Sequence, residues 1–319
     1  MTAATSATAH PSPLERSDLL GLLLVVVIWG LNFVVMKVGL ASFTPFQMGA
    51  GRYVFAFLPL ALLVRRPAVR TRWIVIFGLL QGVGQFGLLF LALKVGMTAA
   101  LASVLLQTQV FFSALFGLLL LHERVARPLM VGLVFAAAGL ACFLVNVSRA
   151  EASAAVTGWG LLLTLAASAM WAASNIVVRL AQREGARFDP LAFVVWCSAV
   201  PIVPFVAMSW IFDAPATHAN WLHAPWIAWA TLAFLGWMAT DLAYGLWTRL
   251  LKRFPANRVA PFSLAVPLIG LAAGILLLGE PIAPLQWLGA LLVLCALLCV
   301  VFGDRLRRRP VNPPGSPNA

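Results

Sequence analysis

Arg52 and Asp241 are the charged residues that lie deepest inside the long apolar stretches of this chain, so they are the first candidates for chemistry. A charged side chain is costly in an apolar environment and therefore needs a polar partner or a function. We expect Arg52 to bond backbone carbonyls or another polar group, with a direct ion pair to Asp241 as the alternative. Asp241 is expected either to carry protons or to be a neutral acid that the structure tolerates.

Polar and aromatic residues recur at helical spacing within the apolar stretches. Trp237, Asp241, Tyr244 and Thr248 are four, three and four residues apart, which places them on one face of a helix. A similar stripe runs through residues 164–175. Such stripes predict a shared, partly hydrated cavity with an aromatic wall and a few orienting hydrogen bonds. The residues predicted to bind a substrate there are Trp29, Asn32, Gln81, Gln85, Gln107, Gln109, Trp171, Asn175, Trp237 and Tyr244.

Each of these residues also has a purely structural interpretation. Gln and Asn in apolar helices often hydrogen-bond to a neighbouring helix, for roughly 0.6–2 kcal/mol. Trp and Tyr near the ends of such helices are often anchors at a membrane surface. Trp29, Trp171 and Tyr244 lie deeper in their segments and are the better candidates for a cavity wall.

The elements that must position these residues follow from hydrophobicity. Of the residues, 62% are apolar and only 10% carry charge, whereas about 25% is usual for soluble domains. Apolar runs recur from about residue 18 to residue 303, and many are long enough for the roughly 20 residues that a bilayer requires. We therefore expect an all-α, multi-pass protein surrounded by membrane lipids.

Ten transmembrane helices are predicted, separated by short connections at prolines and charged runs. Their approximate ranges are 18–37, 45–64, 72–94, 98–121, 127–147, 157–179, 190–212, 226–248, 256–278 and 284–303.

The basic residues predict the orientation of these helices. If the N-terminus is cytoplasmic, 18 of the 22 Lys and Arg residues lie on the cytoplasmic side. Three lie outside (Lys37, Lys94 and Arg149), and Arg52 lies within a helix. This bias follows the positive-inside rule and predicts that both termini are cytoplasmic. The net charge of +12 is thus a feature of topology and lipid headgroups, and no nucleic-acid partner is expected.

The chain repeats itself weakly. WGLNFVVMK at 29–37 resembles WAASNIVVR at 171–179, and LLLHE at 119–123 resembles LLLGE at 276–280. Because each half has five helices, the second half enters the membrane from the opposite side, as in inverted-repeat transporters. The predicted divisions are a disordered tail at 1–16, a first repeat at 17–149, a second repeat at 150–303 and a basic, mobile tail at 304–319.

Motifs for enzymatic chemistry are absent from the sequence. GxxxxGK[ST] does not occur, so we do not expect this chain to hydrolyse ATP, and no cofactor is predicted. HExxH and GxSxG are missing, and the four histidines fall outside the interiors of the predicted helices. We therefore predict no catalytic residues and no metal site. An intramembrane enzyme and a passive scaffold are the less favoured alternatives.

Several segments together resemble the EamA family of the drug/metabolite transporter superfamily. They are VVVIWGLNFVVMKVGL (25–40), Gly51-Arg52-Tyr53, GQFG (84–87), LASVLLQTQVFFSALFGLLLLHER (101–124) and RVAPFSLAVPLIGLAAGILLLGE (258–280). The resemblance implies ten helices in two inverted halves, with a central cavity made by helices 1, 3, 4, 6, 8 and 9. On this pattern Arg52 fits the family's helix-2 arginine, and Glu123 and Glu280 fit its helix-end glutamates.

The resemblance also implies a function. It is nearest to the branch that exports cysteine-pathway metabolites such as O-acetylserine and cysteine, by alternating access and across the inner (cytoplasmic) membrane. The expected partners are a small amino-acid metabolite and protons; the oligomeric state is not predicted. A transporter of phosphorylated solutes or drugs is the alternative. Two departures from the family pattern concern the substrate: Gln109-Val110 replaces a common mid-helix proline, and Asp241 occupies a usually apolar place.

Overall fold

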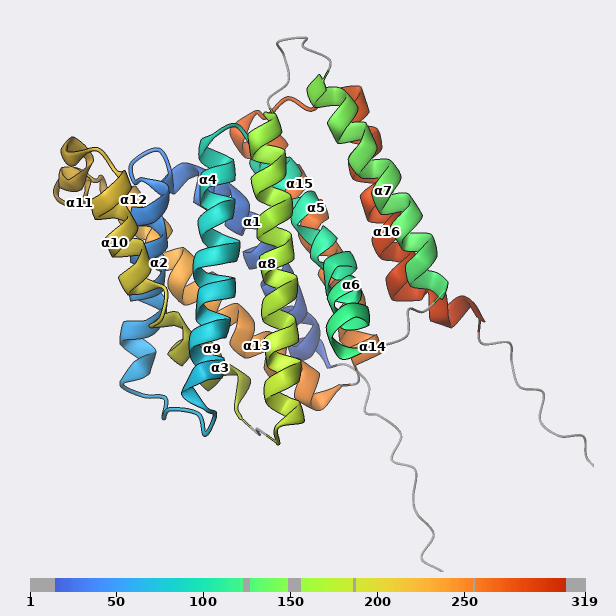
Figure 1. Cartoon of the computed structure of the whole chain (residues 1–319), viewed down its shortest axis with the longest axis horizontal. Coiled ribbons are helices and arrows are strands. Elements are labelled where there is room, and N and C mark those ends of the chain that lie inside the picture. The colour runs from blue at the N-terminus through green and yellow to red at the C-terminus, as the bar shows by residue number, and fades with distance from the viewer. Residues whose placement is uncertain (1–14, 123–126, 149–155, 186–187, 255, 308–319) are drawn as a thin grey trace, which may run out of the picture.

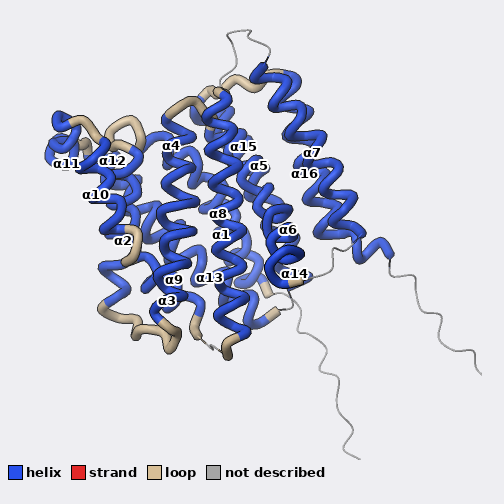
Figure 2. Tube along the Cα trace, in the orientation of Figure 1, coloured by secondary structure: helices blue, strands red, loops and turns tan. Residues whose placement is uncertain are grey.

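The protein folds as a bundle of helices in the computed structural model, which describes residues 15–122, 127–148, 156–185, 188–254 and 256–307. Within these ranges the chain forms helices and loops and no strand (Figure 2). Figure 1 shows most helices running side by side across the bundle, with α7 and α16 packed together at one edge.

The first half of the chain contains five helical segments. The third and fourth are each divided by an irregular turn. In order, the segments are α1 (Arg16–Gly39); α2 (Pro45–Ala61); α3, η1 and α4 (Thr71–Phe77, Gly78–Gly87 and Leu88–Lys94); α5, η2 and α6 (Ala99–Leu105, Leu106–Thr108 and Gln109–Leu121); and α7 (Arg127–Ser148).

The second half repeats this order with one additional short helical connection. Its segments are α8 (Gly158–Arg183); α9 and α10 (Pro190–Ser198 and Ile202–Phe212); the connection η3 and α11 (Pro215–Ala219 and Asn220–His223); α12, η4 and α13 (Trp226–Ala233, Phe234–Leu242 and Ala243–Arg253); α14, η5 and α15 (Ala256–Val259, Ala260–Leu264 and Ala265–Leu278); and α16 (Pro284–Arg307).

Nine continuous helical segments in the described part of the chain are long and apolar enough to cross a membrane, and some of them combine several labelled helices. The helix α2, at 17 residues, is shorter than the others and is not among the nine. The protein is therefore a multi-pass, all-helical membrane protein. The count of ten spans and the cytoplasmic location of both termini stay predictions.

Local deviations from α-helix occur at matching places in the two halves. The third segment of each half contains a π-helix, at Gly78–Gly87 and at Phe234–Leu242. The fourth segment of each half contains a 3₁₀ turn, at Leu106–Thr108 and at Ala260–Leu264. π-helical and 3₁₀ turns inside longer helices often mark functional sites or hinges.

Helix ends also correspond. Thr44 and Asp189 each cap a helix whose first residue is a proline, and in both cases the side chain accepts backbone N–H groups of the first turn. The fourth segments end at His122 and Gly279, which both adopt the left-handed conformation with φ of 55° and 64°. Glycine does this without strain, whereas His122 is the only described non-glycine residue with positive φ.

The two ends of the bundle have different chemistry. One end, which we call the basic rim, is defined by exposed side chains of Arg65, Arg66, Arg70, Arg72, Arg249, Lys252 and Arg253. Ion pairs here join segments that are distant in sequence: Lys252 contacts Asp189 at 2.6 Å and Arg253 contacts Asp18 at 2.6 Å. The other end, the opposite rim, contains the ends of α1 and α4 and the start of α5, which Lys37 and Glu280 tie together.

Candidate functional site

A cavity of about 540 Å³ occupies the bundle interior between mid-height and the basic rim. Its deepest lining residues, such as Asn32 and Gln85, lie mid-way along their helices. Gln182, Pro190 and Leu251 line it close to the helix ends at the basic rim. The cavity therefore approaches the basic rim and stops short of the opposite rim.

Nine of the ten residues predicted to bind substrate line this cavity. They are Trp29, Asn32, Gln81, Gln85, Gln107, Gln109, Trp171, Asn175 and Tyr244. They come from α1, η1, η2, α6, α8 and α13. Further lining residues come from α2, α9, η5 and α16, so more helices contribute than the family pattern implies.

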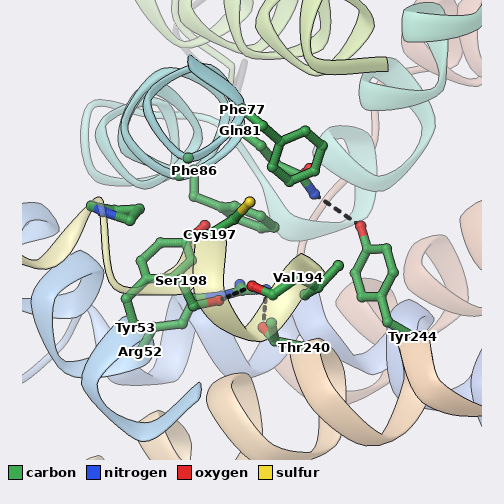
Figure 3. A pocket seen from close by; sticks show the side chains of 13 residues that line it. Arg52, Tyr53, Phe77, Gln81, Phe86, Val194, Cys197, Ser198, Thr240 and Tyr244 are labelled. Atoms are coloured by element: carbon green, nitrogen blue, oxygen red, sulfur yellow. Dashed lines mark hydrogen bonds between the residues drawn. The ribbon is translucent and has the colours of Figure 1, made fainter. Parts of the chain in front are cut away.

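Amide and hydroxyl groups in the wall hydrogen-bond across the cavity. Gln81 Nε2 donates to the hydroxyl of Tyr244 at 3.0 Å (Figure 3). Asn175 Nδ2 donates to Gln109 Oε1 at 3.2 Å, and the same oxygen accepts from Ser113. These bonds leave other groups free: within the described structure, Asn32 Oδ1 and Gln85 Oε1 are buried without a donor. The wall thus contains both hydrogen-bonded amides and amide oxygens that no described donor satisfies.

An aromatic cluster forms another part of the wall. Trp29 packs against Tyr244 at 5.3 Å and against Trp247 at 5.5 Å between ring centroids. Its indole Nε1 donates to the Ala239 carbonyl in the π-helix η4 at 3.0 Å. Because Trp29 and Tyr244 both line the cavity and belong to different halves, the cluster joins the halves beside the cavity.

Arg52 lies in the wall of this cavity deep within the bundle, and it is 2% exposed. Its Nη2 donates to Thr240 Oγ1 at 3.1 Å, and Thr240 in turn donates to the Leu235 carbonyl at 2.8 Å. The guanidinium carbon lies 3.7 Å from the centroid of the Phe86 ring, a cation–π contact. Its Nε and Nη1 find no acceptor among the described residues.

A small side pocket of about 20 Å³ adjoins the cavity at Arg52 (Figure 3). Arg52, Gln81, Phe86 and Tyr244 line both spaces. Tyr53, Cys197, Ser198 and Thr240 line the side pocket alone. A space of this size is enough for about one water molecule or one carboxylate oxygen.

Asp241 does not form the alternative ion pair with Arg52. Its side chain is 6% exposed, and both carboxylate oxygens lack a donor among the described residues. Nor is it among the described residues that line the cavity or the side pocket. The neighbouring residue Thr240 holds Arg52 instead. The expectation that Arg52 bonds another polar group matches the structure, whereas the cavity-facing position expected for Asp241 is corrected.

Trp237 is likewise not among the described cavity-lining residues, which corrects its predicted position. It is 42% exposed and packs edge-on against Phe55, with centroids 5.2 Å apart. The reason is the π-helix Phe234–Leu242. Each π turn is one residue wider than an α turn. In an α-helix this spacing would place Trp237 and Asp241 on the same face as Tyr244. In the π-helix the same spacing places them on a different face.

Several cavity residues were missed by the sequence analysis. Phe86, Trp247 and Thr248 line the space, and Phe86 contacts Arg52 directly. The sequence analysis did place Thr248 on the stripe of Tyr244, but it did not name Thr248 among the substrate-binding residues. For Phe86 there was no signal beyond its position next to Gln85, because adjacent residues of a regular α-helix point about 100° apart.

The opposite rim closes the bundle above the cavity. Glu280, at the end of α15, accepts the backbone N–H groups of Ala99 and Ala100 at 2.8 Å each. Lys37 donates to the carbonyls of Leu93 and Met97 at 2.7 and 2.9 Å. Glu280 therefore caps a helix in the other half, and Lys37 caps the end of α4. Glu123, the other predicted helix-end glutamate, lies outside the described residues.

Comparison with known proteins assigns the fold. The EamA-like transporter family matches residues 16–145 and 158–302. This chain belongs to that family. As an EamA-like protein it is a membrane transporter and not an enzyme.

Relatives of this EamA-like protein are similar over nearly their whole length. Two proteins called "Probable amino-acid metabolite efflux pump", from Salmonella typhimurium and Escherichia coli, are each 38% identical to it and align over 92% of this chain and 98% of their own. A "Probable terminal-alkyne amino-acid exporter" from Streptantibioticus cattleyicolor is 23% identical over 92% and 96% of the two chains.

A solved crystal structure supports the fold alone. It covers 93% of this chain and 100% of its own, with a TM-score of 0.58 and 17% sequence identity.

Proposed function

We propose that this protein is a secondary active exporter of small amino-acid metabolites of the cysteine and O-acetylserine type. It would move them across the cytoplasmic (inner) membrane by alternating access. The observation that carries the proposal is the cavity of about 540 Å³, lined by amides and aromatic rings, which reaches the basic rim but not the opposite one. Its volume is within the range of small-molecule sites. The names of the two relatives that are 38% identical supply the substrate class.

The proposed orientation in the membrane follows from the charge at the basic rim. Clustered Lys and Arg residues favour the cytoplasmic side. With that orientation, the structure is the inward-facing state, in which an exporter loads its substrate. The Glu280 and Lys37 contacts hold the outer end closed.

Alternating access needs two states of similar free energy, which two inverted halves supply. We propose the halves 17–149 and 150–303. The support is the recurrence of π-helices, 3₁₀ turns, proline-first caps and left-handed ends at corresponding places. Asp241 supports proton coupling, because it is a buried acid whose two carboxylate oxygens have no hydrogen-bond donor among the described residues. Lipids surround the bundle as its other partners.

The cavity argues against phosphorylated solutes. Arg52 is the only charged side chain among the described residues that line it, and a doubly charged anion requires several bases. A zwitterionic or singly charged solute fits a single arginine better.

The test is efflux from cells and from proteoliposomes. Expression should speed the appearance of cysteine or O-acetylserine in the medium and raise tolerance to toxic concentrations of either. The comparison variant is Gln107→Trp, which places a bulky ring in the cavity wall and should slow this efflux. The proposal would be rejected if cells with the wild type, cells with Gln107→Trp and cells without the transporter released these and other amino acids at the same rate.

A further inference from the structure

No anion among the described residues hydrogen-bonds to Arg52, and the buried Asp241 acts on its charge only through longer-range electrostatics. Its side chain is 2% exposed, and Nε and Nη1 have no acceptor among the described residues. Thr240, whose side chain is the hydrogen-bond partner of Arg52 among the described residues, offers a neutral hydroxyl. A buried cation without a hydrogen-bonded anion is strongly unfavourable. The two unpaired guanidinium donors are therefore left for an anion from outside the protein.

The geometry around Arg52 suits an anion that arrives through the cavity. The guanidinium lies in the wall shared by the large cavity and the side pocket, with Phe86 covering one face at 3.7 Å (Figure 3). The bond to Thr240 fixes its plane. A planar guanidinium can bind a carboxylate through two parallel hydrogen bonds. The side pocket of about 20 Å³ has room for one of the two carboxylate oxygens.

The opposite chemistry is also present in the same cavity. Asn32 Oδ1 and Gln85 Oε1 are buried acceptors with no donor in the described structure, and both residues line the cavity. Amide oxygens accept N–H bonds from an ammonium group without requiring a charged partner. Free donors on Arg52 and free acceptors on two amides together complement a zwitterion.

We propose that Arg52 binds the carboxylate of the transported solute, while Asn32 and Gln85 accept hydrogen bonds from its ammonium group. The substrates are then α-amino acids with an unmodified carboxylate. This inference rests on the proposed function and names the groups that define its substrate class. Binding requires the cavity wall to rearrange locally, because Arg52 Nε and Nη1, Asn32 Oδ1 and Gln85 Oε1 are all buried in the described structure.

The experiment measures binding of three probes to the purified full-length protein in detergent. The probes are L-cysteine, cysteamine, which lacks the carboxylate, and 3-mercaptopropionate, which lacks the amine. The wild type should bind cysteine most tightly. Arg52→Gln should lower the affinities for cysteine and 3-mercaptopropionate by about 10- to 100-fold, as loss of hydrogen bonds to a charged group implies. It should leave the affinity for cysteamine unchanged. Asn32→Ala should do the reverse, weakening cysteine and cysteamine but not 3-mercaptopropionate.

Two further variants separate recognition from folding. Thr240→Val keeps the arginine but removes the hydroxyl that orients it. The variant should therefore lower the affinity for cysteine about 5- to 10-fold and leave the affinity for cysteamine unchanged. It keeps the test decisive if Arg52→Gln does not fold. Arg70→Gln is the matched control, because this arginine is exposed at the basic rim; it should change none of the three affinities.

The outcomes distinguish the two proposals. Cysteine binding that survives in Arg52→Gln, or an equal loss of all three probes, overturns the inference and leaves the exporter intact. Wild-type protein that neither binds nor exports any amino acid overturns the proposed substrate class and the inference with it.

Discussion

Gln81 Nε2 donates a hydrogen bond of 3.0 Å to the hydroxyl of Tyr244, a residue 163 positions further along the chain. Gln81 lies in the π-helix η1, and Tyr244 follows the π-helix η4 by two residues. The bond therefore joins the irregular third segments of the two halves across the cavity. A hydrogen bond in this place couples the position of one half to that of the other.

Loss of this bond should weaken both stability and transport. Tyr244→Phe removes the acceptor while retaining the ring that packs on Trp29. We expect a loss of about 1 kcal/mol in the free energy of unfolding, the usual value for one net hydrogen bond. Denaturation of Tyr244→Phe, Gln81→Leu and the double variant forms a cycle that isolates the pair. A coupling energy near zero would show that the bond is incidental.

Glu280→Gln should loosen the closed end of the bundle. The carboxylate accepts two backbone N–H groups at the start of α5, and its charge strengthens both bonds. We expect the amide to shift the protein toward the outward-facing state by about 1 kcal/mol. In a cysteine-free background carrying Asn32→Cys, an impermeant thiol reagent applied from outside should label the cavity about fivefold faster.

The control for that experiment is Glu184→Gln, which changes the acid that contacts Arg72 and Trp73 at the basic rim. It should not raise labelling from outside. Equal labelling of the wild type and Glu280→Gln would show that this cap does not hold the closed end.

Asp241→Asn should fold normally, because both carboxylate oxygens lack donors in the described structure and the amide has the same shape. If Asp241 carries the coupled proton, the variant should lose the response of transport to an imposed pH gradient. Uptake and efflux in proteoliposomes with and without the gradient provide the measurement. A response like that of the wild type would reduce Asp241 to a structural role.

Asp189 should make stability depend on pH at the basic rim. The Lys252 ammonium, together with the N–H groups of Leu191 and Ala192, lowers the pKa of this carboxyl. A lowered pKa in the folded state means that the stabilisation is present at neutral pH. It is lost as the pH falls below the ordinary aspartate value of about 4 and through the folded pKa.

Asp189→Ala should therefore lower the Tm at pH 7, at a cost of about 1 kcal/mol for a lost N-cap. The difference from the wild type should shrink at strongly acidic pH. Asp189→Asn retains a capping oxygen without the charge, so it should fall between the two. Melting curves in detergent at both pH values are the measurement, and a constant difference across pH would contradict the assignment.

The sequence alone determined the membrane environment, the family and most of the cavity wall. These features depend on local properties of the sequence, namely runs of apolar residues and the placement of arginines. They also depend on polar residues such as Gln81 and Asn175, which are rare in apolar helices unless they have a structural or functional role. Polar residues inside a membrane bundle must face other polar groups. Listing them therefore located the cavity without any knowledge of helix packing.

Only the tertiary structure decided which way individual side chains point and which pairs they form. Trp237 and Asp241 leave the stripe of Tyr244 because a π-helix changes the number of residues per turn. Phe86 covers Arg52, and Glu280 caps α5, through contacts between segments far apart in the chain. Such contacts depend on how whole helices pack against one another, and residue spacing within a single helix does not determine that packing.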